Sequence, residues 1–205
     1  AQEMAQLKTI LDQGSEVQIE TPTTDLRLSI ADRTGVNSAA SVAYDSHNLP
    51  SGEVFTAPAD AEGTITFDLP RTVDGTRLAG VELRVENNEV VDYAAEQGEA
   101  TLGELLDTDT GASRLGELGI GMNRGIDRLT DRILFDEKMA ETVHLAIGRA
   151  YDACLPEGET GIDSAIHVDL LADMRTDSRL LVYGECIQQN GTFRWEEGFA
   201  ATTAE

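Results

Sequence analysis

The sequence is poor in several residue types, and each shortage narrows what the protein can do. Its 205 residues include only 2 cysteines, and Cys154 and Cys186 form no CxxC pair. Sparse cysteine is typical of a reducing compartment and predicts a cytoplasmic protein. The opening segment AQEMAQLKTI lacks a basic-then-apolar leader, so we expect no secretory signal. No run approaches the roughly 18 consecutive apolar residues of a membrane span, which predicts a protein without a membrane partner.

Basic residues are scarce, with 15 Lys and Arg against 38 Asp and Glu and a formal net charge of −23. Affinity for nucleic acid depends mainly on Lys and Arg side chains that neutralise phosphates. The 1 Trp, 4 Tyr and 5 Phe also offer little surface for stacking bases. We therefore expect no nucleic-acid partner.

Lysine is almost absent, since Lys8 and Lys138 are the only two in the chain. Diffuse acidity with few lysines favours a halophilic protein, because at ~1 M salt the Debye length falls to about 3 Å and repulsion between surface carboxylates is screened. The alternative is a carboxylate-rich surface that binds calcium or a basic partner. A melting temperature that did not rise between dilute buffer and molar KCl would contradict the halophilic interpretation.

Alternation of apolar and polar residues recurs along most of the chain and predicts a β-rich fold. The length fits one domain, and a chain of this size can fold without disulfide or metal. We expect a single α+β domain over residues 1–205, with a mixed or antiparallel sheet, a few short helices and a flexible tail at 198–205. The expected helices are 4–11, a short helix around 102–106 and 126–135. The expected strands are 17–20, 26–30, 64–69, 81–85, 90–93, 142–147, 166–171, 180–183 and 186–188, with hairpin turns at Asn87-Asn88 and Asn190-Gly191.

The triplet His167-Val168-Asp169 is the most informative local pattern. Side chains at i and i+2 of a strand share one face, about 6–7 Å apart along the chain, so His167 and Asp169 can converge on one ion. An imidazole nitrogen and a carboxylate oxygen suit zinc, cobalt or manganese. The alternative is an exposed polar face on a half-buried strand.

Three further residues are candidates whose spacing alone leaves two interpretations open. His144 lies between Thr142 and Ala146 on the polar side of its predicted strand, where small neighbours leave room for a ligand but equally suit a hydrogen-bonded core histidine. Glu53 and Glu117 lie in segments rich in glycine or proline, which predict stiff loops. Buried glutamates are rare unless they are paired or bind a metal, and the alternative is a solvated loop acid.

Four longer segments taken together resemble the M29 aminopeptidases. They are LPSGEVFTAP, GASRLGELGIGMN, ILFDEKMAETVHLAIGRAY and SAIHVDLLADM, and the similarity extends over nearly the whole chain. The resemblance implies a co-catalytic centre with two divalent metal ions, either zinc, cobalt or manganese. Carried over by motif, the metal ligands are Glu53, Glu117, His144, His167 and Asp169, and the catalytic residues are Tyr151 and Glu117.

The resemblance also implies a function, namely removal of N-terminal residues from peptide substrates by a water that two metal ions activate. Tyr151 would donate a hydrogen bond to the oxyanion and Glu117 would shuttle a proton, in a protein that forms a homodimer. His47 is not among the implied ligands, and we expect it behind them or at the surface. Family members carry a further N-terminal domain, so one alternative is a metal-binding domain without turnover and with a structural or assembly role. A weaker alternative is an acidic binding module without a transition metal.

Overall fold

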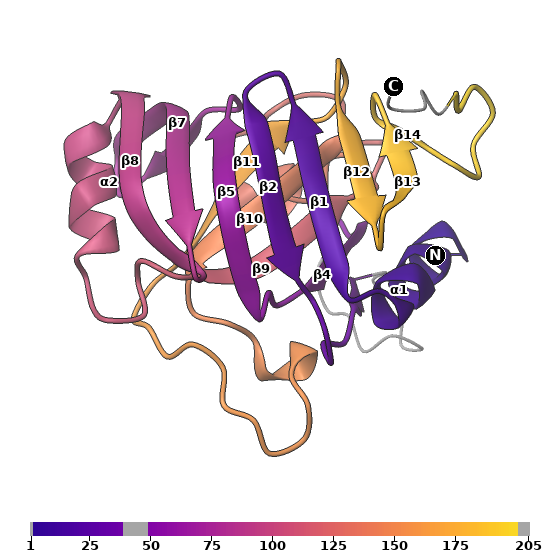
Figure 1. The fold of residues 1–205 in the computed structure, drawn as a ribbon. Helices are drawn as coiled ribbons and strands as arrows, with labels where there is room; N and C mark the ends of the chain where they lie inside the picture. Colours follow the sequence, from indigo (N-terminus) through magenta and orange to yellow (C-terminus); the bar gives the residue numbers. More distant parts are fainter. Residues whose placement is uncertain (1, 39–48, 201–205) are drawn as a thin grey trace.

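Strands form most of the chain in the computed structural model, which describes residues 2–38 and 49–200. They build two sheets that lie one in front of the other, with helices at the margins (Figure 1). The elements in chain order are α1 (Gln2–Gln13), β1 (Glu16–Thr21), β2 (Thr24–Ser29), β3 (Val36–Ser38), β4 (Glu53–Thr56), β5 (Asp60–Phe67), β6 (Arg71–Val73), β7 (Thr76–Glu86), β8 (Glu89–Gln97), α2 (Glu99–Leu106), β9 (Leu115–Gly121), α3 (Ile133–Asp136), β10 (Thr142–Gly148), the 3-10 turn η2 (Asp152–Cys154), β11 (His167–Asp173), β12 (Arg179–Val182), β13 (Glu185–Gln189) and β14 (Thr192–Phe193).

The larger sheet follows the predicted alternation. In the described part of the chain it has nine strands in the order β14-β13-β12-β1-β2-β5-β7-β6, with β8 also paired to β7. Along β2, Leu26 and Leu28 are buried while Asp25 and Arg27 are exposed, so one face packs inward and the other meets solvent. Both predicted hairpin turns are confirmed, because Asn87-Asn88 and Asn190-Gly191 have the positive φ values that a two-residue hairpin turn requires.

The smaller sheet has the order β11-β10-β9-β4-β3, and all its strand pairs are antiparallel. Every residue of β9 and β10 is buried, so both faces of the sheet are covered. One face supplies Leu118 and Leu145 to a core shared with Leu28 and Ile65 of the larger sheet. The α+β class with antiparallel strands and few short helices is therefore confirmed, and the opposite face of the smaller sheet is left for polar residues.

Three local predictions are wrong. The helix expected at 126–135 is restricted to α3, because the buried carboxylate of Asp136 accepts hydrogen bonds from the backbone and hydroxyl of Thr130 and from the Arg132 N–H, which fixes an irregular turn. The expected strand 64–69 ends at Phe67. Glu53 and Glu117 lie in strands β4 and β9 and not in loops, since both segments pair with neighbouring strands on the smaller sheet.

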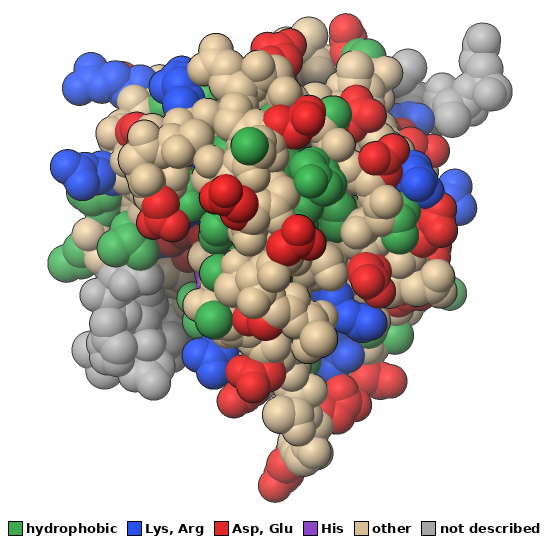
Figure 2. Space-filling view, turned by 90° about the vertical axis from the view of Figure 1, so that its left-hand side faces the viewer, with side chains coloured by type: hydrophobic (Ala, Val, Ile, Leu, Met, Phe, Trp, Pro, Cys, Tyr) green, Lys and Arg blue, Asp and Glu red, His purple; other side chains and the backbone are tan. Residues whose placement is uncertain are grey.

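The surface carries its acidity in a dispersed form. Figure 2 shows carboxylates spread over the face that carries α2 and β8, without one dominant cluster. This distribution fits the diffuse acidity of the sequence, and the halophilic interpretation stays a prediction. Of the helices in the described part of the chain, none combines the length and hydrophobicity that crossing a bilayer requires. His47 and residues 201–205 of the predicted tail lie outside the described residues.

Candidate metal centre

The polar face of the smaller sheet is organised by strand register. Ala146 on β10 pairs with Glu117 on β9 and with Asp169 on β11, so the three side chains form one row across the sheet. Directly paired residues of antiparallel strands point to the same face, a few ångströms apart. Because alanine contributes only a methyl group, the two carboxylates can reach over it toward each other.

A second row places the buried histidine. His144 pairs with Gly119 on β9, and a Cβ built onto that glycine would lie 1.9 Å from the His144 Nε2. Glycine at this position therefore leaves the space that the imidazole ring fills. Glu53 begins β4 opposite Gly121, which places its side chain beside the same ring.

The structure brings all five predicted ligands together in two overlapping groups. The inner triad consists of Glu53, Glu117 and His144, whose ligand atoms all lie within 4.8 Å of one another. The His144 Nε2 lies 3.2 Å from the Glu117 Oε1 and 3.6 Å from the Glu53 Oε2. One imidazole nitrogen therefore faces two carboxylates.

The outer triad consists of Glu117, His167 and Asp169, which satisfy the same 4.8 Å limit. The His167 Nε2 lies 3.4 Å from the Asp169 Oδ1 and 3.8 Å from the Glu117 Oε2. The convergence expected from the i, i+2 spacing of His167 and Asp169 is thus present. Glu117 belongs to both triads and directs a different oxygen toward each histidine.

The carboxylates of these triads are buried with oxygen atoms left over. The Oε2 atoms of Glu53 and Glu117 and the Oδ1 of Asp169 have no hydrogen-bond partner among the described residues. Buried polar atoms without partners are costly, and proteins usually satisfy them with another group or an ion. Three carboxylates and two imidazoles are a donor set that suits zinc, cobalt or manganese, so these residues fit divalent metal ions.

Burial and mutual proximity shift the pKa values of the inner triad. Burial raises the pKa of Glu53 to about 7, although His144 and Lys138 oppose the shift. Burial likewise raises the pKa of Glu117. Burial lowers the pKa of His144, but its hydrogen bond with Glu117 and the nearby charge of Glu53 outweigh this effect and raise it to about 9. Without an ion, the inner triad therefore retains protons near neutral pH.

The outer triad has a more oriented histidine and a more acidic carboxylate. The Nδ1–H of His167 donates to the Arg149 carbonyl at 2.8 Å, which leaves Nε2 facing the carboxylates, as in many metal-binding histidines. Burial opposes protonation of His167, but Asp169 outweighs it and raises the pKa to about 9. Burial also opposes ionisation of Asp169, yet His167, His144 and Arg71 lower its pKa to about 2.

Tyr151, the predicted catalytic tyrosine, lies at the open edge of the outer triad. Its side chain is 46% exposed, and its ring centroid lies 4.9 Å from that of His167 and 5.8 Å from that of Phe55. Burial and the charge of Glu117 raise the pKa of Tyr151 to about 12. The phenol therefore remains protonated over the neutral range and is available as a hydrogen-bond donor.

Two basic residues at the site were not predicted from the sequence. Lys138 is fully buried, and its Nζ lies 3.1 Å from the Glu53 Oε1 while also pairing with Glu137. Arg71 on β6 donates to the Asp169 backbone carbonyl and lies 3.8 Å from its Oδ2. The scarcity of lysine was the one available signal for Lys138, while nothing in the sequence marks Arg71, which a distant segment supplies.

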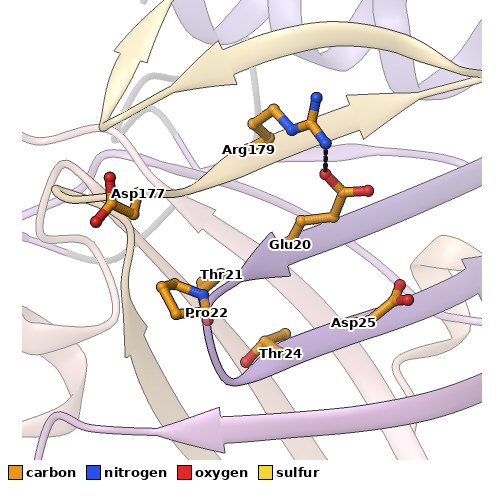
Figure 3. A pocket seen from close by; sticks show the side chains of 7 residues that line it. All are labelled: Glu20, Thr21, Pro22, Thr24, Asp25, Asp177 and Arg179. Carbon is orange, nitrogen blue, oxygen red and sulfur yellow. Dashed lines mark ion pairs between the residues drawn. The ribbon is translucent and has the colours of Figure 1, made fainter. Parts of the chain in front are cut away.

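Two surface hollows differ in their relation to these triads. One of about 450 Å³ is lined by Tyr151 and Arg149, which both contact His167 of the outer triad. Another of about 400 Å³ lies where β1 turns into β2 (Figure 3) and contains no histidine. There Glu20 pairs with Arg179 at 2.5 Å, and the groups of potential metal ligands found among the described residues do not include this hollow.

Similarity to curated proteins covers most of this chain but less than half of theirs. Aminopeptidase 2 of Geobacillus stearothermophilus is 38% identical over 149 residues, which are 63% of this chain and 36% of that protein. Aminopeptidase T of Thermus thermophilus is 35% identical over 164 residues, which are 72% of this chain and 40% of that protein. The chain thus spans well under half the length of these relatives.

Solved structures show the same fold. AmpT from Thermus thermophilus matches with a TM-score of 0.81 at 29% identity and covers 94% of this chain and 52% of its own. A 2,5-dihydroxypyridine dioxygenase from Pseudomonas putida KT2440 matches with a TM-score of 0.72 over 95% of this chain and 59% of its own, but at 15% identity it shows the fold alone. The fold by itself therefore does not decide the chemistry. The profile described as thermophilic metalloprotease (M29) matches residues 1–193, and this chain belongs to the M29 family.

Proposed function

We propose that this chain is the metal-binding catalytic part of an aminopeptidase that removes N-terminal residues from peptides with the help of two divalent metal ions. The observation that carries the proposal is the pair of triads that share Glu117, one buried and one with a partly exposed histidine. Membership of the M29 family and relatives named as aminopeptidases support the same reaction. A peptide substrate, a homodimer and a cytoplasmic location remain parts of the proposal.

The triads indicate which residues hold each ion. The inner triad would hold one and the outer triad the other, with zinc, cobalt and manganese all compatible with these ligands. Glu117 is the proposed bridging ligand, because its Oε1 lies near His144 and its Oε2 near His167. The spacing of the sequence leaves the bridging ligand open, and these two distances support Glu117 in that role.

When bound, two such ions lower the pKa of a shared water and polarise the carbonyl that is attacked. Tyr151 would donate its phenolic hydrogen to the oxygen that gains negative charge, and a donor in this role contributes on the order of 3 kcal/mol. Glu117 is also our candidate for carrying the proton from the attacking water toward the departing amine, a role that would require one of its two oxygens to leave its ion. Peptide would approach from the outer triad, where Tyr151 and the neighbouring hollow face solvent.

Metal analysis combined with peptide hydrolysis tests this proposal. Metal-free protein reconstituted with cobalt or zinc in molar salt should contain two ions per chain and hydrolyse leucyl amide. Asp169→Ala should lose the outer ion and most of the activity, because it removes an outer ligand, whereas Asp92→Ala, which alters an exposed aspartate on β8, should change neither. An Asp169→Ala protein that kept both ions and undiminished hydrolysis would refute the proposal.

A second candidate function is a metal-binding domain without turnover, with a structural or assembly role. The observation that favours it is the coverage of only 36% and 40% of the two curated relatives. Two bound ions without hydrolysis by this chain would favour the non-catalytic domain. Absence of bound metal would contradict both functions.

A further inference from the structure

The connection between β9 and β10 carries a lysine into the inner triad. The Asn123 N–H donates to the Lys138 carbonyl at 2.8 Å, which closes the base of the connection. The Asn123 side-chain amide donates to the Ser51 carbonyl at 2.6 Å and so ties this base to the segment that precedes Glu53. Asn123 thereby links the backbone of Lys138 to the segment that leads into Glu53.

Lys138 is an unusual residue for its surroundings. It is one of two lysines in the chain, and its exposed fraction is 0%. Lysine is almost never fully buried unless it is paired, because removing an ammonium from water is costly. Its partners are Glu53, at 3.1 Å, and Glu137. A lysine kept in this position therefore calls for a role that a smaller apolar residue could not fill.

Charge explains why two acids accompany this lysine. A lone ammonium beside the inner triad would repel a divalent cation, because repulsion between like charges is strongest where water is excluded. The pair formed by Lys138 and Glu137 has no net charge, yet it still presents an N–H donor to Glu53. The pair can thus orient Glu53 without adding positive charge to the centre.

The contacts of Glu53 show what this donor does. Its Oε1 lies near the Lys138 Nζ, while its Oε2 has no hydrogen-bond partner among the described residues and lies 3.6 Å from the His144 Nε2. We propose that Lys138, neutralised by Glu137, is a positioning residue that holds Glu53 as a one-oxygen ligand and thereby sets the affinity and geometry of the inner metal site. This inference rests on the proposed function, because it requires that the inner triad binds an ion.

Single-ion backgrounds separate the two sites in the test. Asp169→Ala should retain the inner ion and His144→Ala the outer one, so Lys138→Met can be measured in each by titration with Co²⁺ against a chromophoric chelator. Residues that orient metal ligands typically contribute 10–100-fold in affinity. We expect Lys138→Met to weaken Co²⁺ binding by about that factor in the Asp169→Ala background and to leave it within about twofold in the His144→Ala background.

The visible absorption of bound Co²⁺ gives a second readout, because it responds to coordination geometry independently of activity. Lys138→Met should change this spectrum only where the inner site is occupied. The matched control is Lys8→Met, since Lys8 is the other lysine and forms a partly exposed ion pair with Asp12 on α1. Lys8→Met should leave both affinities and the spectrum unchanged.

Glu137→Gln keeps the inference testable if Lys138→Met does not fold. This substitution removes the negative charge that neutralises the Lys138 ammonium. It should weaken Co²⁺ binding at the inner triad at least several-fold and weaken binding at the outer triad less. Unchanged affinities in the variants, or equal losses at both sites with a lower melting temperature, would overturn the positioning role and indicate a merely structural pair. Failure of the unmodified chain to bind Co²⁺ would instead refute the proposed function.

Discussion

The two triads share Glu117 but differ in their access to solvent. His144 of the inner triad is fully buried, whereas the His167 side chain of the outer triad is 20% exposed and lies beside the half-exposed Tyr151. Strand order explains the difference, because β10 is an interior strand of the smaller sheet and β11 lies at its edge. The same face of the sheet therefore carries a metal-ligand triad closed to solvent, the inner one, beside a triad that solvent can reach, the outer one.

The residues behind the triads differ as well. The inner triad is backed by the buried Lys138, and the outer triad by Arg71, which contacts Asp169 through both backbone and side chain. We therefore expect the inner position to be governed by the fit of its ligands and the outer position to be the one that meets substrate.

The largest expected effect is the loss of both metal ions by one substitution. Glu117→Gln preserves the size of the shared side chain but removes the negative charge that each triad uses. We expect neither ion to be retained after gel filtration, as measured by elemental analysis. Leucyl-amide hydrolysis should fall on the order of 1,000-fold, which corresponds to the loss of ~4 kcal/mol of transition-state stabilisation.

The matched control for this change is Glu104→Gln, which alters an exposed carboxylate on α2. It should retain both ions and full hydrolysis. If Glu117→Gln retained one ion at the affinity of the unmodified chain, Glu117 would belong to a single triad and the sharing inferred from the geometry would be wrong.

The sequence predicted the outer half of this arrangement better than the inner half. His167 and Asp169 are two residues apart on one strand, so their convergence depends only on strand periodicity. The hairpin turns were predictable for the same reason, because Asn-Asn and Asn-Gly encode their backbone conformation locally. Both features need no knowledge of which distant strands pair.

The inner triad depends on contacts that local patterns do not encode. Glu53 and Glu117 are brought to His144 by the pairing of β4 with β9 and of β9 with β10. Glycine and proline in these segments predict loops, and only the family resemblance placed the two glutamates near the histidines. Gly119 lies in a strand although glycine is typical of turns. Its missing side chain leaves room for His144 on the neighbouring strand, and this role follows only from the pairing of the two strands.

A smaller effect should follow from filling that space. Gly119→Ala places a methyl group where the His144 ring lies, at 1.9 Å from its Nε2 in the present geometry, so the ring must move. We expect affinity for the inner ion to fall about tenfold, as for other changes that misalign a metal ligand, while the outer ion binds normally. Co²⁺ titration in the Asp169→Ala and His144→Ala backgrounds measures the two sites separately.

Gly35→Ala is the control for the added methyl group, because the Cβ there would meet the Asp12 carboxylate at 3.3 Å and the Lys8 side chain at 3.4 Å, and neither residue belongs to a triad. It should leave both affinities unchanged. If Gly119→Ala weakened Co²⁺ binding equally at both triads, the whole strand would have shifted. The expectation that only the inner triad is affected would then be wrong.

The smallest expected effect is a difference in the protons released when each position is filled. Metal ligands must be deprotonated, so a group with a raised pKa gives up a proton on binding and makes affinity increase with pH until that pKa is passed. At pH 6 the inner triad carries protons on His144, with a pKa of about 9, and on most of Glu53, with a pKa of about 7. In the outer triad His167 is protonated, whereas Asp169, with a pKa of about 2, is already ionised.

Glu117 contributes once to either single-ion protein, so the difference between them comes mainly from Glu53. At pH 6 the Asp169→Ala protein should release ~1 proton more per ion than the His144→Ala protein, and the difference should shrink as the pH rises past 7. Calorimetric titration in buffers with different ionisation enthalpies measures this number directly. Equal proton release at pH 6 would show that Glu53 is already ionised before the ion binds. The two triads would then not differ in the protonation of their carboxylates.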